Sequence, residues 1–256
     1  MKKPAGSKEG AGAEMPISGH LQELRSRLVR SVLIISLAFG AAFYFSDTLL
    51  FFLKRPLHAE LIFLAPAEAF WADLKVSLFV GFLAALPVIL YEIWQFVAPG
   101  LLPNERGYLF PFLIFATLLF FAGMAFCYLV ALPLALDFLI NYGVRSGITP
   151  QISVSMYIDF NLKFLFGFGL VFELPLAMLF LSRMGLMTPA FFSQNRKYAV
   201  LLSFLIAAIL TPTPDIFNQC VMAIPLILLY EVGIVIVRIF GSVVSLRKEE
   251  PGGMSP

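Results

Sequence analysis

Residues 169–180 read GLVFELPLAMLF, an apolar run with a single carboxylate, Glu173, near its centre. The run lies inside a longer apolar segment, residues 159–182, and about 20 such residues are enough for a helix to cross a bilayer core of about 30 Å. A charge at that depth costs roughly 2.5–3.5 kcal/mol on insertion scales, so the protein must either compensate it or use it. The stretch therefore predicts a membrane helix with an embedded acid.

The composition of the whole chain supports a membrane protein. Hydrophobic residues make up 60% of the 256 residues, charged residues make up only 13%, and the mean hydropathy is +0.89. A soluble domain carries about 25% charged residues, so we expect the lipid bilayer to surround this chain. The formal net charge of +2 is too small to suggest a nucleic-acid partner. Cys127 and Cys220 lack the spacing of a metal site or a disulfide framework, so we expect neither a metal nor a cofactor.

The apolar segments predict an all-α polytopic membrane protein with six transmembrane helices. Four predicted spans lie near residues 29–50, 76–94, 108–134 and 159–182. Two shorter spans follow, Tyr198–Leu210 and Val221–Val237, separated by a Pro-rich stretch that cannot continue a helix. Two neighbouring short helices imply a locally thinned bilayer or a groove beside them.

The distribution of basic residues predicts the orientation, because cytoplasmic segments carry an excess of Lys and Arg. With both termini cytoplasmic, that side holds Lys2, Lys3, Lys8, Arg25, Arg27, Arg30, Arg106, Arg183, Arg196, Lys197, Arg238, Arg247 and Lys248. The opposite side holds only Lys54, Arg55, Lys75, Arg145 and Lys163. The two ends of the chain are therefore expected in the cytoplasm.

The domain organisation follows from the same pattern. Residues 1–15 are polar and rich in Gly and Ala, which predicts a disordered cytoplasmic tail, and residues 241–256 form a second tail. Residues 16–240 then form one transmembrane domain. The outward segments 54–75 and 137–158 mix apolar and polar residues with prolines, which predicts ordered caps. Prolines within the predicted spans should bend several helices and give a partly concave bundle: Pro87, Pro111, Pro133, Pro175 and Pro225.

Two interpretations of Glu173 follow from its helical neighbours. Small residues, Gly169 and Ala177, flank it on the same helix face, so another helix can approach closely there. The acid is then a docking point for a partner helix that carries a polar group, or a site that hydrates a groove. The alternative is a protonated carboxyl that forms a hydrogen bond within its own bundle, for example to the carbonyl of Val171, which Pro175 leaves without its helical donor.

Two further acids lie on the predicted cytoplasmic side. Glu23 belongs to an amphipathic segment, ISGHLQELRSRLVR at residues 17–30, and lies four residues before Arg27, which by spacing alone is an ordinary surface ion pair. Glu105 lies in the stretch YEIWQFVAPGLLPNERGY, residues 91–108, where Trp94 and Phe96 fit an interfacial aromatic belt. Glu105 either caps the next helix or belongs to a binding surface.

Several blocks, taken together and in order, resemble the TatC family, the multi-spanning core of the twin-arginine protein translocase. These blocks are HLQELRSRL, PVILYEIWQFVAPGL, NER, FELP and TPTPDIFNQ, and the match covers roughly Pro16 to Phe240. The resemblance implies a glove-like six-helix protein of the bacterial cytoplasmic (inner) membrane. It also implies TatA-type and TatB-type single-span partners, self-association within the translocase, and export of folded cargo with Arg-Arg signal peptides by the proton-motive force.

The resemblance also implies roles for individual residues. Signal-peptide binding is expected at Glu23, Arg25, Phe96, Pro99, Glu105 and Arg106. A polar site for partner helices is expected within the membrane at Glu173, Thr211, Asp215 and Gln219. The extra Pro214 departs from the family pattern and leaves the role of Thr213 open. Paired guanidiniums favour carboxylate partners, because both oxygens accept charge-assisted hydrogen bonds in a geometry that Lys does not reproduce.

Two other function classes compete with this interpretation. A proton-coupled small-solute secondary transporter would use Glu173 as its titrating group, but such proteins usually contain internal repeats, and the sequence contains no convincing repeat. An intramembrane enzyme would need catalytic motifs such as HExxH, GxSxG, a Walker sequence or paired mid-membrane aspartates, and we find none of them. We therefore do not expect an enzyme.

Overall fold

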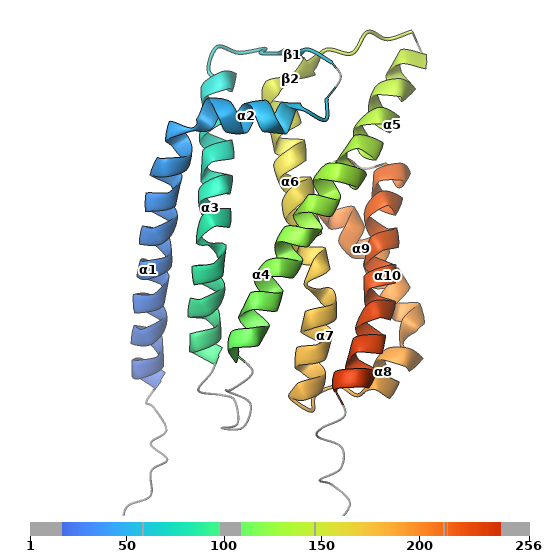
Figure 1. Ribbon diagram of the computed structural model, residues 1–256. Helices are drawn as coiled ribbons and strands as arrows, with labels where there is room; N and C mark the ends of the chain where they lie inside the picture. The colour runs from blue at the N-terminus through green and yellow to red at the C-terminus, as the bar shows by residue number, and fades with distance from the viewer. Residues whose placement is uncertain are drawn as a thin grey trace, which may run out of the picture.

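The computed structural model describes residues 17–57, 59–97, 109–145, 147–211, 213 and 215–241, and within them the protein is a helical bundle (Figure 1). The helices are α1 (Ile17–Tyr44), α2 (Ser46–Lys54), α3 (Glu68–Val97), α4 (Leu109–Phe126), α5 (Leu132–Arg145), α6 (Val154–Phe172), α7 (Leu174–Arg183), α8 (Pro189–Gln194), α9 (Arg196–Leu210) and α10 (Ile216–Phe240). The only strands in these residues are β1 (Leu61–Ile62) and β2 (Ile152–Ser153), which pair in parallel. The all-α prediction is confirmed.

Five helical stretches of the described chain are long and apolar enough to cross a membrane, namely Leu21–Tyr44, Glu68–Phe96, Phe110–Arg145, Val154–Arg183 and Ile216–Phe240. The short fifth span appears as α9, whose 15 residues reach only about 22 Å. Helix α1 begins and α10 ends at the same end of the bundle, which we call the lower end as drawn in Figure 1. An even number of crossings is therefore required, which agrees with six spans if α9 is one of them.

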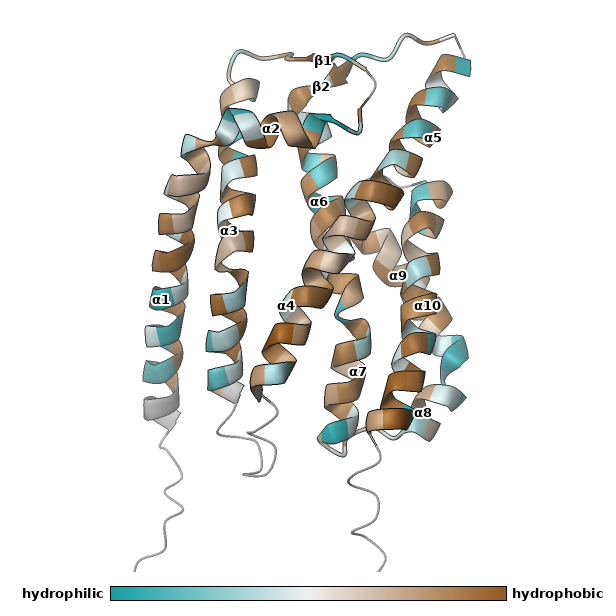
Figure 2. Ribbon diagram, in the orientation of Figure 1, coloured by the Kyte–Doolittle hydropathy of each residue, from teal (hydrophilic) through white to brown (hydrophobic). Residues whose placement is uncertain are grey.

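Hydropathy follows this architecture. Figure 2 shows hydrophobic residues along most of the helix lengths, with hydrophilic residues on the lower turns of α1 and the upper turns of α5. The main core gathers buried side chains of α3, α5, α6 and α10, among them Val76, Leu132, Phe164, Phe168 and Met222. Helix α1 is different, because it packs mainly against α3 and exposes most of its apolar residues.

The predicted ends of the first and third spans are wrong, and each has a local cause. The first span does not continue to residue 50, because the chain turns at Phe45 and α2 runs across the upper end of the bundle (Figure 1). The third span does not stop at residue 134, since a π-helical turn, Cys127–Ala131, precedes Pro133 and lets the helix continue to Arg145. Such a turn accommodates the hydrogen bond that proline cannot donate.

The sixth span was predicted as short but is not. Helix α10 has 25 residues and begins at Ile216, before the predicted Val221, because Asp215 caps its first turn. The Oδ1 atom of Asp215 accepts a hydrogen bond from the backbone N–H of Asn218 at 2.7 Å. Pro225 lies inside this helix without ending it.

The predicted ordered caps at the upper end are confirmed within the described residues. Strand β1 pairs with β2 through Leu61 opposite Ile152 and Ile62 opposite Ser153. The hydroxyl of Tyr157 donates to the carbonyl of Leu53 at 2.8 Å, and so joins α6 to the end of α2. These bonds hold the two outward segments against each other. The predicted tails, residues 1–15 and most of 241–256, lie outside the described residues.

The contact between α1 and α3 depends on a glycine and generates a first prediction. A Cβ atom at Gly81 would lie 2.6 Å from the backbone nitrogen of Phe39, whereas a Cβ at Gly40 would have no neighbour within 4 Å. Gly81→Ala must therefore push α1 away from α3, and we expect destabilisation of about 1–3 kcal/mol. Gly40→Ala is the matched control on α1 and should leave stability unchanged or raise it. Thermal unfolding of both variants in detergent measures the difference, and equal midpoints would contradict this account of the contact.

The cap of α10 generates a second prediction. Asp215→Ala removes the acceptor for the Asn218 backbone N–H, and we expect a loss of about 0.5–2 kcal/mol in the free energy of unfolding. Asp215→Asn keeps a side-chain oxygen at the same position and should retain most of the stability. Thermal unfolding of the two variants side by side tests this. An Asn variant as unstable as the Ala variant would mean that the charge, and not the cap, stabilises the helix.

Candidate functional site

The lower end of the bundle carries a cluster of charged side chains between α1 and α3. We define the Glu23 cluster as Glu23, Arg27 and Arg30 of α1 with Glu92 of α3. Arg27 is the central member, because its Nε atom donates to Oε1 of Glu23 at 3.1 Å while its Nη1 atom donates to Oε2 of Glu92 at 2.8 Å. Its Nη2 atom also donates to Glu23. The guanidinium of Arg27 thus links α1 to α3.

The surroundings of these side chains are not those of an ordinary surface pair. Only 15% of the Arg27 side chain and 9% of the Glu92 side chain are exposed, whereas 60% of the Arg30 side chain is exposed. Arg30 donates to Glu92 at 3.4 Å and to the hydroxyl of Ser26 at 3.3 Å. The predicted Glu23–Arg27 pair forms, but it is partly buried and not the exposed surface pair that the spacing indicated. Two carboxylates and two guanidiniums balance one another in a partly buried place.

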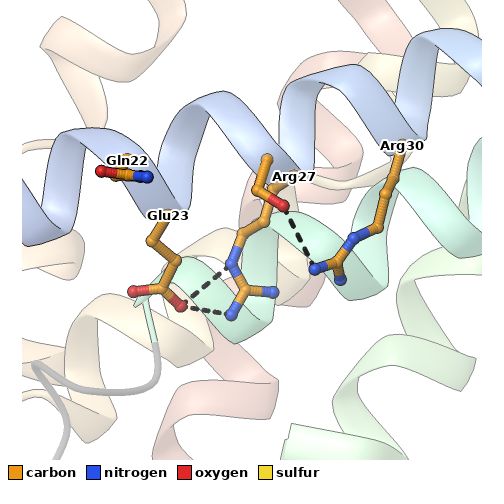
Figure 3. A pocket seen from close by; sticks show the side chains of 5 residues that line it. Gln22, Glu23, Arg27 and Arg30 are labelled. Carbon is orange, nitrogen blue, oxygen red and sulfur yellow. Dashed lines mark hydrogen bonds and ion pairs between the residues drawn. The ribbon is translucent and has the colours of Figure 1, made fainter.

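A cavity of about 410 Å³ opens along this part of α1. Its lining consists of Gln22, Glu23, Ser26, Arg27 and Arg30. Figure 3 shows the carboxylate of Glu23 turned toward the guanidinium of Arg27, with Arg30 one turn further along the helix. Carboxylate and guanidinium groups at the wall of one cavity can exchange hydrogen bonds with a charged peptide side chain.

The structure places only some of the predicted signal-binding residues. Glu23 lies in the cluster, Arg25 lies exposed on the same helix, and Phe96 lies half-buried on the last turn of α3, at the same lower end. The remaining three residues of that prediction, Pro99, Glu105 and Arg106, lie outside the described residues. Their relation to Glu23 therefore stays a prediction.

Glu92 is the member of the cluster that the sequence analysis missed. It is 7% exposed and lies within the predicted span 76–94. The available signal was the one used for Glu173, an acid inside an apolar run. It was overlooked because it lies close to the predicted end of the span, where an acid can reach the membrane surface.

Glu173 lies at an interruption of the fourth span. Helix α6 ends at Phe172 and α7 begins at Leu174, with Pro175 in the first turn of α7. Within the described residues its Oε1 atom is buried and has no hydrogen-bond partner. The helix that approaches the small residue Gly169 is α4 of the same chain, since a Cβ at Gly169 would lie 2.7 Å from the ring of Phe120. Half of the predicted docking face is thus already covered, while Ala177 on the other side of Glu173 is exposed.

An aromatic cluster connects the lower part of this span to α3. Trp94 lies 5.1 Å from Phe112 of α4 and 4.8 Å from Phe180 of α7, measured between ring centroids. Phe180 is on the Glu173 face of the fourth span. The end of α3 that carries Glu92 and Phe96 is therefore packed directly against the helix that begins beside Glu173.

The third group of predicted residues forms the turn between α9 and α10. Asp215 caps α10, and the amide of Asn218 donates both to Asp215 at 2.9 Å and to the hydroxyl of Thr213 at 2.9 Å. Gln219 donates to the carbonyl of Phe204 on α9 at 3.0 Å, and Thr211 is buried at the end of α9. These side chains thus stabilise their own turn, and Thr213, whose role was open, takes part in it.

Potential metal ligands and cysteines are scattered in the described part of the chain. No group of three or more His, Cys, Asp or Glu side chains there is arranged to hold a metal ion. Cys127 is fully buried in the core and Cys220 is partly buried on α10.

Comparison with known proteins gives one consistent family. The family model described as "Sec-independent protein translocase protein (TatC)" matches residues 19–225. A Sec-independent protein translocase protein TatC from Aquifex aeolicus (strain VF5) is 41% identical over 242 residues, covering 92% of this chain and 98% of the relative. The protein of the same name from Helicobacter pylori (strain ATCC 700392 / 26695) is 38% identical over 219 residues, covering 86% of each chain.

Solved structures agree with this result. A crystal structure described as the twin arginine translocase receptor TatC has a TM-score of 0.75 and 41% identity, covering 86% of this chain and 98% of that chain. A second crystal structure of a twin arginine translocase receptor TatC, in the detergent DDM, has a TM-score of 0.76 and 43% identity, covering 85% of this chain and 98% of that one. With the membrane-spanning helices, these matches show that the chain belongs to the TatC family of multi-pass membrane proteins, which are components of the twin-arginine protein translocase.

Proposed function

We propose that this chain is the part of the translocase that binds the Arg-Arg signal peptides of folded cargo. The observation that carries the proposal is the partly buried carboxylate of Glu23, which already accepts hydrogen bonds from the Nε and Nη2 atoms of Arg27. A site that fits one guanidinium in this way is suited to another, because the geometry of the donors is the same. Glu105, in the segment between α3 and α4, supplies the second carboxylate, with Arg25, Phe96, Pro99 and Arg106 around the peptide.

The lower end of the bundle is the cytoplasmic end in this proposal. The basic residues of the described helix ends favour it: Arg25, Arg27, Arg30, Arg183, Arg196, Lys197 and Arg238 belong to the lower end, and Lys54, Arg55, Lys75, Arg145 and Lys163 belong to the upper part. The protein then lies in a bacterial inner membrane with both termini in the cytoplasm, where signal peptides arrive. Export across that membrane is driven by the proton-motive force.

The partner proteins in this proposal are TatA-type and TatB-type single-span membrane proteins, together with further copies of this chain. Glu173 is the polar group that receives a partner helix, and its buried Oε1 atom, without a hydrogen-bond partner among the described residues, supports this role. An unpaired polar atom in an apolar bundle gains free energy when a partner supplies a donor. Thr211, Asp215 and Gln219 act indirectly, through the shape of the α9–α10 turn.

A direct binding measurement tests the proposal. The full-length protein in nanodiscs is titrated with a signal peptide that carries Arg-Arg and with its Lys-Lys twin, and we expect the Arg-Arg peptide to bind about tenfold tighter or more. Glu23→Gln and Glu105→Gln should each remove most of that preference. Glu60→Gln, an exposed acid at the upper end, is the control and should bind as the unchanged protein does. Equal affinities for the two peptides would overturn the proposed role in signal recognition.

A separate prediction concerns Glu173. Glu173→Ala should leave signal-peptide affinity within about twofold of the unchanged protein, because the acid is remote from the Glu23 cluster along the bundle. It should strongly reduce co-purification of a TatA-type partner expressed in the same membranes. Asp137→Ala, which removes an exposed acid of α5, serves as the control and should keep the partner. If signal binding fell as much as partner assembly, the two sites would not have separate roles.

A further inference from the structure

Glu92 binds two different arginines of the neighbouring helix, one with each of its oxygens. Its Oε2 atom accepts from Arg27 at 2.8 Å and its Oε1 atom accepts from Arg30 at 3.4 Å. The residue is 7% exposed and lies one turn before Phe96 on α3. It is therefore a buried acid that shares Arg27 with Glu23, the carboxylate that we assign to signal recognition.

Arg27 stands between the two acids and creates a problem for recognition. The guanidinium already occupies Glu23 through two of its nitrogen atoms, so an arginine of a signal peptide must compete for the same carboxylate. The peptide also brings positive charge toward a helix that already holds Arg25, Arg27 and Arg30. Without a second acid, the arginines of α1 would repel the signal peptide, and Arg27 would continue to occupy the Glu23 carboxylate.

The geometry points to a specific solution, which rests on the function proposed above. We propose that Glu92 is a positioning residue for signal recognition, which keeps Arg27 paired while an arginine of the signal peptide takes its place on Glu23. Arg27 is only 15% exposed, so it cannot leave Glu23 for water without a partner. Glu92 is that partner, and its 2.8 Å hydrogen bond with Arg27 is present before the peptide binds. The exchange then leaves every charged group paired.

The charge balance of the cluster supports the same role. Glu23 and Glu92 offset Arg27 and Arg30, so the cluster is neutral before binding. Replacing Glu92 by Gln would leave the cluster with a net positive charge and would leave Arg27 with Glu23 as its one acid within the cluster. Both effects oppose an incoming arginine. A simpler role, in which Glu92 only pins α1 to α3, makes a different prediction for Arg27.

The test measures Arg-Arg peptide binding to the full-length protein in nanodiscs for four proteins: unchanged, Glu92→Gln, Arg27→Gln and the double variant. We expect Glu92→Gln to weaken binding about five- to tenfold. Arg27→Gln removes the competitor and should bind at least as tightly as the unchanged protein. The double variant should return to within about twofold of the unchanged protein, because the cation that Glu92 must hold is gone. Glu231→Gln, which breaks the exposed bidentate pair with Arg196 at 2.7 and 2.9 Å, is the matched control and should have no effect.

Each other outcome has a distinct meaning. If the unchanged protein does not prefer Arg-Arg over Lys-Lys, the proposed function fails and this inference fails with it. If the unchanged protein shows the preference but Glu92→Gln binds equally well, only the role of Glu92 is overturned. If both single variants weaken binding and the double variant is not rescued, Glu92 merely pins the two helices together. Gel filtration of each variant before titration ensures that only folded protein is compared.

Discussion

Backbone groups inside an apolar bundle need partners within the protein, and this requirement determines where the helices can be interrupted. The break between α6 and α7 is closed by two bonds, from the N–H of Glu173 to Leu170 and from the N–H of Ala177 to Glu173. The turn between α9 and α10 is closed by Asp215, Thr213 and Asn218. Polar side chains therefore accumulate at the interruptions, where they pair with backbone and side-chain groups of the same turn.

Charged side chains between α1 and α3 also need partners within the protein. Gly81 lets the two backbones approach at Phe39, and nearer the lower end Arg27 of one helix pairs with Glu92 of the other. A buried ion pair contributes little net stability compared with apolar packing, but breaking it leaves a costly unpaired charge. The pair joins the two helices at this level, and Glu23 lies in the wall of the cavity along α1.

The sequence was sufficient for the fold class and for the five long membrane-spanning helices, because long apolar runs bounded by charges are unambiguous. The ends of the helices were harder to predict, because they depend on local turns and caps, which the hydropathy of a segment does not indicate. Pro133 does not end its helix because a π-helical turn precedes it, and α10 begins early because Asp215 caps it. The Glu23–Arg27 pair followed from spacing, but its burial required knowledge of α3. Glu92 is an acid inside an apolar run, which the sequence shows, but its pairing with Arg27 required the two helices to be seen side by side.

Glu92 and Glu173 are both acids in apolar helices, but their surroundings differ. Glu92 has both oxygens engaged by arginines of the same chain, so it has little to offer a foreign group and acts on ligands through Arg27. Glu173 has a buried oxygen without a partner in the described chain, beside the exposed Ala177, so it can still accept a donor from another helix. The rings of Trp94, Phe112 and Phe180 pack between the two regions. These rings fill the space between the lower end of α3 and α7, so the two acids lie on opposite sides of one packed aromatic cluster.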